Sequence, residues 1–386
     1  MGNVPNLRFP EFTGEWKKCK LKDVCTFYSG GTPSSSNKDY YNGDIPFIRS
    51  GELHSDKTEL FISSKGLKNS SAKMVSKGDL LLALYGATSG DIAISQIEGA
   101  INQAILCIKT DQSKGFIEAT WCKHVKRILQ TYLQGGQGNL SADIVKNIAF
   151  YFAPLKEQEK LTQLMKLLDE RIATQNKIIE KLQSLIKGLI DDIITLKCGQ
   201  LVAFETLYSK AGEGGTPTTS NTEFYDNGSI PFIKIDDLSN KYLSANKDYI
   251  TELGLKKSSA WLIPTHSIIY SNGATIGAIS INKYPVCTKQ GILGIVPNTN
   301  IDVEFLYYFM QSSYFQKEVE RVVTEGTMKT AYLKDINHIK CPIPDLDRQK
   351  EISHLLSVLS LKEDVERQLL QKYQIQKQYL LRKMFI

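Results

Sequence analysis

An internal repeat occupies most of this sequence and constrains its fold more than any other feature. Gly30–Pro33 returns as Gly214–Pro217, and Asn42–Arg49 returns as Asn227–Lys234 with its Ile-Pro-Phe-Ile segment unchanged. Three further segments repeat in the same order: 66–72 as 254–260, 86–88 as 273–275, and 103–106 as 290–293. Because chance similarity does not stay in register over such a length, the sequence predicts one fold present twice, with small insertions in its loops.

The repeat continues into a helical segment behind each globular part. From Leu161 onward, apolar residues recur at alternating steps of four and three, with no proline between Lys156 and Lys197. Such a heptad seam is typical of a coiled coil. The seam residues are Leu161, Met165, Leu168, Ile172, Ile179, Leu182, Ile186 and Leu189, with the polar Gln175 among them.

A second helix of similar length, with a less regular seam, is expected from Asp347 to Lys383. Each helix has one apolar face and needs a partner, so the two are expected to pack together as an antiparallel coiled coil. At 1.5 Å per residue, each makes a rod of about 60 Å that separates the two globular domains. The predicted division is a domain at 1–155, a helix at 156–198, a second domain at 199–345 and a second helix at 346–386.

Strands and turns dominate the predicted secondary structure of each globular part. The sequence predicts strands at 21–28 and 201–208, buried strands at 79–84 and 267–270, and helices at 116–133 and 303–323. The predicted fold class is therefore a tandem pair of α/β (α+β) domains, each followed by a long helix, with pseudo-twofold symmetry.

The bulk properties exclude several classes of protein. No apolar run approaches the roughly 18 residues of a membrane-spanning helix and no secretory signal pattern opens the chain, so a cytoplasmic protein is expected. The seven cysteines are scattered without a C-x-x-C pair, which predicts reduced thiols and no zinc site. The formal charge of +6 is compatible with a nucleic-acid partner but does not demand one.

Sequence motifs that would carry catalysis are missing. The sequence has no G-x-x-x-x-G-K-[ST] phosphate loop, no G-x-G-x-x-G and no H-E-x-x-H motif, and its five histidines are isolated. We therefore expect a non-catalytic chain that binds no metal and no cofactor of its own.

Loops rich in small and polar residues are the candidate contacts to nucleic acid. Gln and Asn amides pair bidentately with adenine, whereas Thr, Ser, Lys and Arg bond phosphates and base edges. The candidates in the first half are Thr32, Ser34, Arg49, Tyr85, Thr88, Gln103, Gln134, Gln137 and Asn139. Those in the second half are Thr216, Thr218, Lys234, Asn272, Thr275, Gln290, Thr327, Lys329 and Thr330. Each loop is equally compatible with being an ordinary turn of a mixed fold.

The order of these motifs resembles one known family. Tandem domains with a Gly-Gly-Thr-Pro-Ser loop (Gly30–Ser34), an Asn-Gly-Asp-Ile-Pro-Phe-Ile segment (Asn42–Ile48) and Gly-Ala-Thr (Gly86–Thr88) are similar to the HsdS specificity subunits of type I restriction-modification systems. In both halves a proline and a glutamine open the long helix (Pro154 and Gln158; Pro344 and Gln349). The resemblance spans nearly the whole chain.

The resemblance implies that the globular parts are target-recognition domains, each reading one half of a bipartite, asymmetric DNA sequence. It also implies that the helices set the gap between the half-sites and help to dock two methyltransferase subunits. Those subunits use S-adenosylmethionine to methylate adenine N6, and two restriction subunits use ATP and Mg for translocation and cleavage. No cofactor is implied for this chain itself.

Two other functions stay open at the level of sequence. The chain is also compatible with the recognition subunit of a system in which methylation and cleavage share one polypeptide. A member of a different class, a coiled-coil scaffold whose globular ends bind protein and not DNA, has the same architecture.

Overall fold

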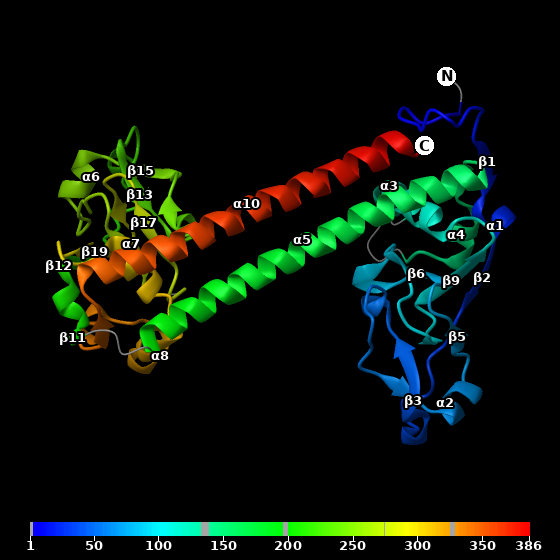
Figure 1. Ribbon diagram of the computed structural model, residues 1–386, viewed down its shortest axis with the longest axis horizontal. Helices are drawn as coiled ribbons and strands as arrows, with labels where there is room; N and C mark the ends of the chain where they lie inside the picture. Colours follow the sequence, from blue (N-terminus) through cyan, green and yellow to red (C-terminus); the bar gives the residue numbers. More distant parts are fainter. Residues whose placement is uncertain (1–2, 133–138, 196–199, 274, 325–328) are drawn as a thin grey trace. The chain divides into compact units, whose positions relative to one another are not determined.

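The computed structural model describes residues 3–132, 139–195, 200–273, 275–324 and 329–386, without the side chains of 193–195 (Figure 1). The chain divides into two compact units. Unit 1 consists of Met1–Asn176 together with Leu369–Ile386, and unit 2 consists of Lys177–Gln368. Each unit therefore contains one globular domain and a part of both long helices.

The domain of unit 1 packs one helix and two sheets in layers. The sheet β2-β9-β6-β7 lies between helix α3 and the sheet β4-β3-β8-β5, and β1 pairs separately with β10. The strands are β1 (Lys17–Lys20), β2 (Cys25–Ser29), β3 (Tyr41–Ile48), β4 (Phe61–Ile62), β5 (Lys73–Val75), β6 (Leu80–Ala83), β7 (Ile92–Ile94), β8 (Gly99–Ile101), β9 (Ile105–Thr110) and β10 (Ala149–Phe152). The helices and 3₁₀ turns are α1 (Leu21–Val24), η1 (Lys38–Tyr40), η2 (Ser50–Glu52), α2 (Ser64–Lys68), η3 (Gly86–Thr88), α3 (Lys114–Tyr132) and α4 (Ala142–Asn147).

Strand β6 explains why the middle layer is apolar throughout. Leu80 and Leu82 point to α3, whereas Leu81 and Ala83 point to the second sheet, because successive strand residues face opposite sides. All four side chains are fully buried. A strand covered on both faces reads as a continuous apolar run, which is how the sequence predicted it.

Unit 2 repeats this layered arrangement. The sheet β12-β19-β16-β17-β14 lies between helices α7 and α8 on one side and the sheet β15-β13-β18 on the other, and β11 pairs with β20. The strands are β11 (Gln200–Ala203), β12 (Tyr208–Glu213), β13 (Ile230–Ile233), β14 (Tyr242–Leu243), β15 (Asp248–Ile250), β16 (Ile268–Ser271), β17 (Ile279–Asn282), β18 (Cys287–Thr288), β19 (Ile292–Pro297) and β20 (Lys340–Ile343). The helices and 3₁₀ turns are η4 (Phe204–Leu207), η5 (Thr222–Phe224), η6 (Ile235–Asp237), α6 (Glu252–Lys256), α7 (Val303–Phe309), α8 (Ser313–Val322) and α9 (Leu333–Ile336).

Three predicted elements are interrupted in the structure. The stretch predicted as a strand at 21–28 opens with the helical turn α1, and the one at 201–208 passes from β11 into the turn η4; these turns bury Leu21 and Phe204 completely. The turn redirects the chain, so that β1 pairs with β10 while β2 pairs with β9. The helix predicted at 303–323 is two helices, because the Ser312 side chain caps the start of α8.

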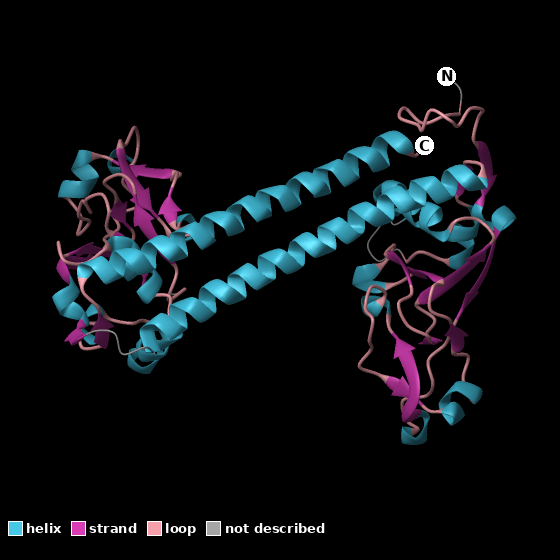
Figure 2. Ribbon diagram, viewed as in Figure 1, coloured by secondary structure: helices cyan, strands magenta, loops and turns pink. Residues whose placement is uncertain are grey.

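Helices α5 (Leu155–Thr195) and α10 (Leu346–Met384) pack together in opposite directions, as predicted. In unit 1, the start of α5 contacts the end of α10: the Arg171 Nε donates to the Tyr373 hydroxyl at 2.9 Å, and Lys377 pairs with Asp169. In unit 2, the end of α5 and the start of α10 share one core, which includes Ile190. These segments are purely helical, whereas the strands lie in the globular domains (Figure 2).

The predicted heptad seam forms the inner face of α5. Among the predicted members, Leu161, Met165, Leu168 and Ile179 are buried, and Ile172, Leu182, Ile186 and Leu189 are half-buried. The finer domain boundaries predicted from the sequence stay a prediction. Within the described ranges, no helix combines the length and the apolar character needed to cross a bilayer.

Candidate nucleic-acid interface

The Gly-Gly-Thr-Pro loops owe their glycines to close packing within the domain. A Cβ atom on Gly30 would lie 1.7 Å from the carbonyl oxygen of Ile101, and one on Gly214 would lie 2.1 Å from that of Thr288. The backbone N–H groups of both glycines also donate to a neighbouring strand or turn. The glycines therefore seat the loop against β8 or β18, and the residues that follow them are left at the surface.

This seating brings together pairs of candidate residues that are distant in the sequence. In unit 1 the Thr32 hydroxyl donates to Oε1 of Gln103 at 2.7 Å, and both residues are exposed. In unit 2 the backbone N–H of Gln290 donates to Oγ1 of Thr216 at 3.5 Å. The same two loops thus meet in both units, but through different atoms.

Backbone hydrogen bonds draw two more candidate loops to the same edge. In unit 1 the N–H of Leu84 donates to Ala104 O at 2.8 Å, and the N–H of Leu140 donates to Leu84 O at 3.0 Å. These bonds place Leu84, which precedes the Tyr85–Thr88 loop, between the Gln103 turn and Leu140.

The equivalent bonds occur in unit 2. The N–H of Asn272 donates to Gly291 O at 3.1 Å, and the N–H of Ala331 donates to Asn272 O at 2.9 Å. In each unit, the end of the central strand therefore lies beside the turn before the next strand and beside one later residue, Leu140 or Ala331. Convergence of loops on a rigid sheet is the usual way to build a binding surface.

Arg49 and Lys234, the basic residues behind the Ile-Pro-Phe-Ile strands, are exposed but paired with carboxylates. Arg49 bonds Glu52 at 2.8 Å and Glu59 at 2.9 Å, and the Lys234 ammonium lies 2.8 Å from Asp248. Burial raises the pKa of Glu52, but hydrogen bonds from Arg49 outweigh it and lower that pKa to about 2. The hydrogen bonds that Arg49 donates to Glu52 and Glu59 raise the pKa of Arg49. Carboxylates therefore hold both basic groups in place.

The other candidates divide by exposure. Ser34, Tyr85, Asn139, Thr218, Thr275 and Lys329 are exposed, and Thr88 and Thr330 are half-buried. Asn272 is buried, and its Nδ2 donates to Ala331 O at 3.2 Å, so in this structure it supports the loop from within. Gln134, Gln137 and Thr327 lie outside the described residues.

Sequence reasoning missed several residues of this surface. Lys289 is exposed, and its N–H donates to Ile233 O at 3.0 Å, which places it beside Lys234 and Gln290. It carries no motif, and only the parallel pairing of β13 with β18 brings it there. The carboxylate partners of Arg49 were missed as well, although Glu52 follows at a spacing of three residues.

The architecture defines a class of protein before any comparison is made. One set of loops is presented twice, by two related domains joined through a helix pair, which is the design of a bivalent recognition protein. Within the described ranges, no three His, Cys, Asp or Glu side chains are grouped to hold a metal ion.

Comparison with known proteins identifies the family. The model of the type I restriction modification DNA specificity domain matches residues 13–184 and again 208–373. The chain belongs to this family, as the sequence predicted. It is the DNA specificity subunit of a type I restriction-modification system, with two target-recognition domains, and catalysis resides on partner subunits.

Individual relatives agree with this assignment. The chain is 22% identical to the MjaVIII specificity subunit of Methanocaldococcus jannaschii, over 96% of this chain and 91% of the relative. It is 30% identical to the EcoR124I/EcoR124II specificity subunit of Escherichia coli over 43% of this chain and 42% of the relative. Its fold is similar to the crystal structure of the S subunit from M. genitalium, with a TM-score of 0.61, 14% identity and 99% of both chains covered.

Proposed function

We propose that each domain reads one half of a bipartite, asymmetric DNA sequence through its converging loops. The observation that carries this proposal is the recurrence of one loop arrangement in both units with different exposed side chains. Ser34 of unit 1 corresponds to Thr218 of unit 2, and Arg49 corresponds to Lys234. A shared scaffold with divergent contacts suits two different half-sites.

The Thr32–Gln103 pair illustrates how such a surface reads a base. Because the Thr32 hydroxyl donates to Oε1 of Gln103, it fixes the plane of the amide, whose Nε2 remains a donor. An amide held in this way can pair with the N7 and N6 edge of adenine, since Oε1 has a second lone pair. In unit 2 the Thr216 hydroxyl instead accepts from the Gln290 backbone N–H. The two units therefore suit different bases.

The paired helices are proposed to set the distance between the two half-sites. A helix of 41 residues is roughly 60 Å long at 1.5 Å per residue, and one turn of duplex DNA advances about 34 Å. A rod of this length suits half-sites separated by more than one turn.

Partner subunits are proposed to supply the chemistry. Two methyltransferase subunits dock on the helices and domains and transfer a methyl group from S-adenosylmethionine to adenine N6. Two restriction subunits use ATP and Mg to translocate and cleave DNA. All of these steps belong in the cytoplasm, where the DNA substrate is. The fused methyltransferase-nuclease system and the scaffold without DNA remain the alternatives.

Methylation mapping tests the proposed function directly. Genomic N6-methyladenine is mapped in cells that carry the methyltransferase subunit, with and without this chain. We expect one bipartite motif that depends on the chain. If no modified motif depends on it, the scaffold function is favoured and the proposed DNA readout is wrong. Linkage to a gene for a single methyltransferase-nuclease polypeptide would instead favour the fused system.

The division of labour between domains and helices has its own test. Replacing residues 1–155 with the corresponding domain of a relative should change one half-site only. Inserting one heptad between Ile172 and Leu189 should lengthen the spacer and leave both half-sites unaltered. A change of half-site bases after the heptad insertion would contradict this division.

A further inference from the structure

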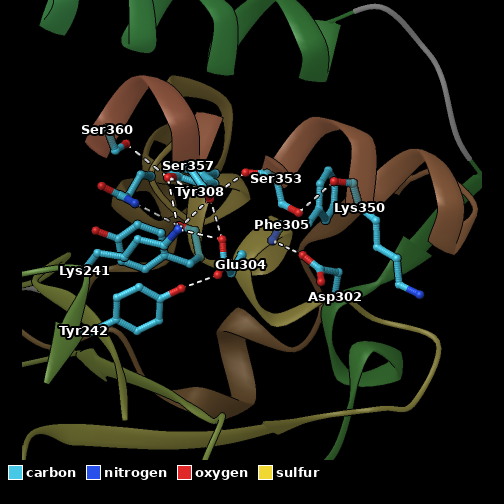
Figure 3. A network of polar contacts seen from close by, with 12 residues as sticks. Lys241, Tyr242, Asp302, Glu304, Phe305, Tyr308, Lys350, Ser353, Ser357 and Ser360 are labelled. Atoms are coloured by element: carbon cyan, nitrogen blue, oxygen red, sulfur yellow. Dashed lines mark hydrogen bonds and ion pairs between the residues drawn. The ribbon is translucent and has the colours of Figure 1, made fainter. Parts of the chain in front are cut away.

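A polar network in unit 2 joins the segment behind β13 to helix α10 (Figure 3). The Lys241 ammonium lies at its centre and donates to Glu304 Oε2 and to Ser357 Oγ, both at 2.7 Å. It also donates to the Tyr308 hydroxyl at 3.2 Å. The Tyr242 hydroxyl donates to the other oxygen of the Glu304 carboxylate. The edge of the sheet, helix α7 and helix α10 therefore meet at one ammonium group.

Aromatic rings shield this ammonium group from water. The Lys241 Nζ atom lies 4.7 Å from the ring centroid of Tyr308, 5.2 Å from that of Tyr242 and 5.8 Å from that of Tyr307. The Lys241 side chain is 16% exposed. Burial raises the pKa of Glu304, but the hydrogen bonds from Lys241 and then Ser357 outweigh it, so the pKa is lowered. The Glu304 carboxylate is therefore ionised at neutral pH, and the hydrogen bonds that it accepts are strong because water competes little.

The backbone of the same segment is fixed to the sheet. The N–H of Ile281 donates to Lys241 O at 2.7 Å, and the Ser280 hydroxyl donates to Asn240 O at 2.6 Å. The segment begins at Lys234, on the candidate DNA surface, and reaches α10 through the Lys241 side chain. A short, doubly fixed segment thus connects the recognition loops to the helix.

Helix α10 meets this segment with serines on one face. Ser353, Ser357 and Ser360 follow one another at steps of four and three, so they lie on the same side of the helix. The Ser357 hydroxyl lies within hydrogen-bonding distance of both Glu304 and Ser353 O, and the Ser360 hydroxyl lies 3.1 Å from that of Tyr308. Serine does not favour a helix interior, so the network explains its use here.

Unit 1 joins its domain to its helix differently. Gln158 and Gln349 mark equivalent places, because each accepts a hydrogen bond from the backbone N–H that opens α3 or α7. Counted from the donors of these bonds, Ser113 and Asp302, Gly115 takes the place of Glu304. Counted from the two glutamines, Lys166 takes the place of Ser357. Lys166 is 73% exposed and pairs with a carboxylate of its own helix at 3.8 Å. The charged network is thus a feature of unit 2 within the described residues.

We propose that Lys241, Glu304 and Ser357 form a positioning lock that fixes the angle of the second target-recognition domain on α10, and thereby the spacer length that the protein accepts. This inference rests on the proposed bipartite readout. The three residues touch no DNA in this scheme. They act through the segment 234–241, which carries the recognition loop at one end and the lock at the other.

The test measures how strictly the complex of this chain with its methyltransferase subunits discriminates spacer length. Methylation rates are compared on duplexes with the native spacer and with spacers one base pair shorter or longer. For Lys241→Met and Ser357→Ala, we expect the preference for the native spacer to fall about tenfold, because charge-assisted hydrogen bonds that fix the domain are lost. Ser357→Thr keeps the hydroxyl and should behave like the wild type. Lys166→Met is the matched control in unit 1 and should leave the preference unchanged.

The outcomes separate this inference from the proposed function. If the wild-type complex methylates no bipartite motif, the proposed function fails. If it does, but both lock variants keep the wild-type spacer preference, the lock is wrong. An equal loss of rate on all spacers, with the preference retained, would also overturn it, since this outcome indicates structural support alone. Relaxed spacing with unchanged half-site bases, restored by the threonine variant, supports it.

Discussion

Replacing Gln349 should loosen the joint between the second domain and α10. This side chain is 1% exposed, and its Oε1 accepts from the N–H of Asp302 at 2.9 Å, while Nε2 donates to Pro344 O at 2.8 Å. Gln349→Leu removes these partners from two part-buried backbone groups, the Asp302 N–H and the Pro344 carbonyl. At about 1–3 kcal/mol for each group, the free energy of unfolding of unit 2 should fall by roughly 2–6 kcal/mol.

Gln349→Glu should produce a loss that depends on pH. Only a protonated carboxyl can donate to Pro344 O, so the pKa of the new group rises in the folded state above its unfolded value of about 4.3. A raised folded pKa means that the stabilising bond is fully present below the unfolded pKa and is lost as pH rises through the folded pKa. This variant should therefore be closest to wild type near pH 4 and weakest at neutral pH.

Hydrogen exchange measured peptide by peptide is the suitable assay, because it separates the two units. In both variants α7 and the first turns of α10 should lose protection, while unit 1 keeps it. Gln158→Leu is the matched control: it should lower the protection of unit 1 and leave the protection of unit 2 unchanged. A loss in unit 2 below about 0.5 kcal/mol, the range of an ordinary surface substitution, would refute the role given to this glutamine.

Three further predictions concern unit 1. Arg8→Met leaves the carboxylate of Glu157, which is 1% exposed, without its cationic partner. Chemical denaturation should show that the free energy of unfolding falls by about 3 kcal/mol and that adding Glu157→Leu largely restores it. A double variant as unstable as Arg8→Met would contradict this role of the ion pair. Gly30→Ala should cost about 1–3 kcal/mol in thermal unfolding, since its Cβ has no room, and an unchanged Tm would count against the close packing. Burial raises the pKa of Asp79, but the hydrogen bonds that it accepts, with the one from Lys109 first, outweigh burial and lower the pKa. The stability that the Asp79 carboxylate contributes is therefore present above pH 3.8 and is lost as pH falls through the folded pKa. Lys109→Met should flatten the dependence of unfolding on acid pH, and an unchanged dependence would exclude a role for this ion pair.

The large-scale features of the fold could be predicted from the sequence because they follow from periodic patterns of apolar residues. The heptad residues Leu161, Met165 and Leu168 lie on the buried face of α5, and the apolar run at β6 is a strand buried on both sides. Local interruptions were not predictable in the same way. The helical turn at Leu21 depends on the pairing of β1 with β10, which closes through residues far along the chain.

The candidate DNA surface stays a prediction, and its contacts within each domain could not be predicted from the sequence. The burial of Asn272 follows from its bonds to residue 331, which the sequence does not place nearby. The Lys241 network likewise joins residues 63 and 116 positions apart. A sequence pattern reports periodicity along the chain, whereas these contacts depend on tertiary packing.

The composition of unit 1 from two separate stretches of chain affects the order in which the protein can fold. Its core includes Met384 and Phe385, and the Phe385 ring lies 5.5 Å from that of Phe116. During synthesis, the apolar core of the domain of unit 1 therefore stays partly uncovered until residues 369–386 have been made. Unit 2 draws its two helix segments and its domain from one continuous stretch, so it can complete its core before unit 1 does.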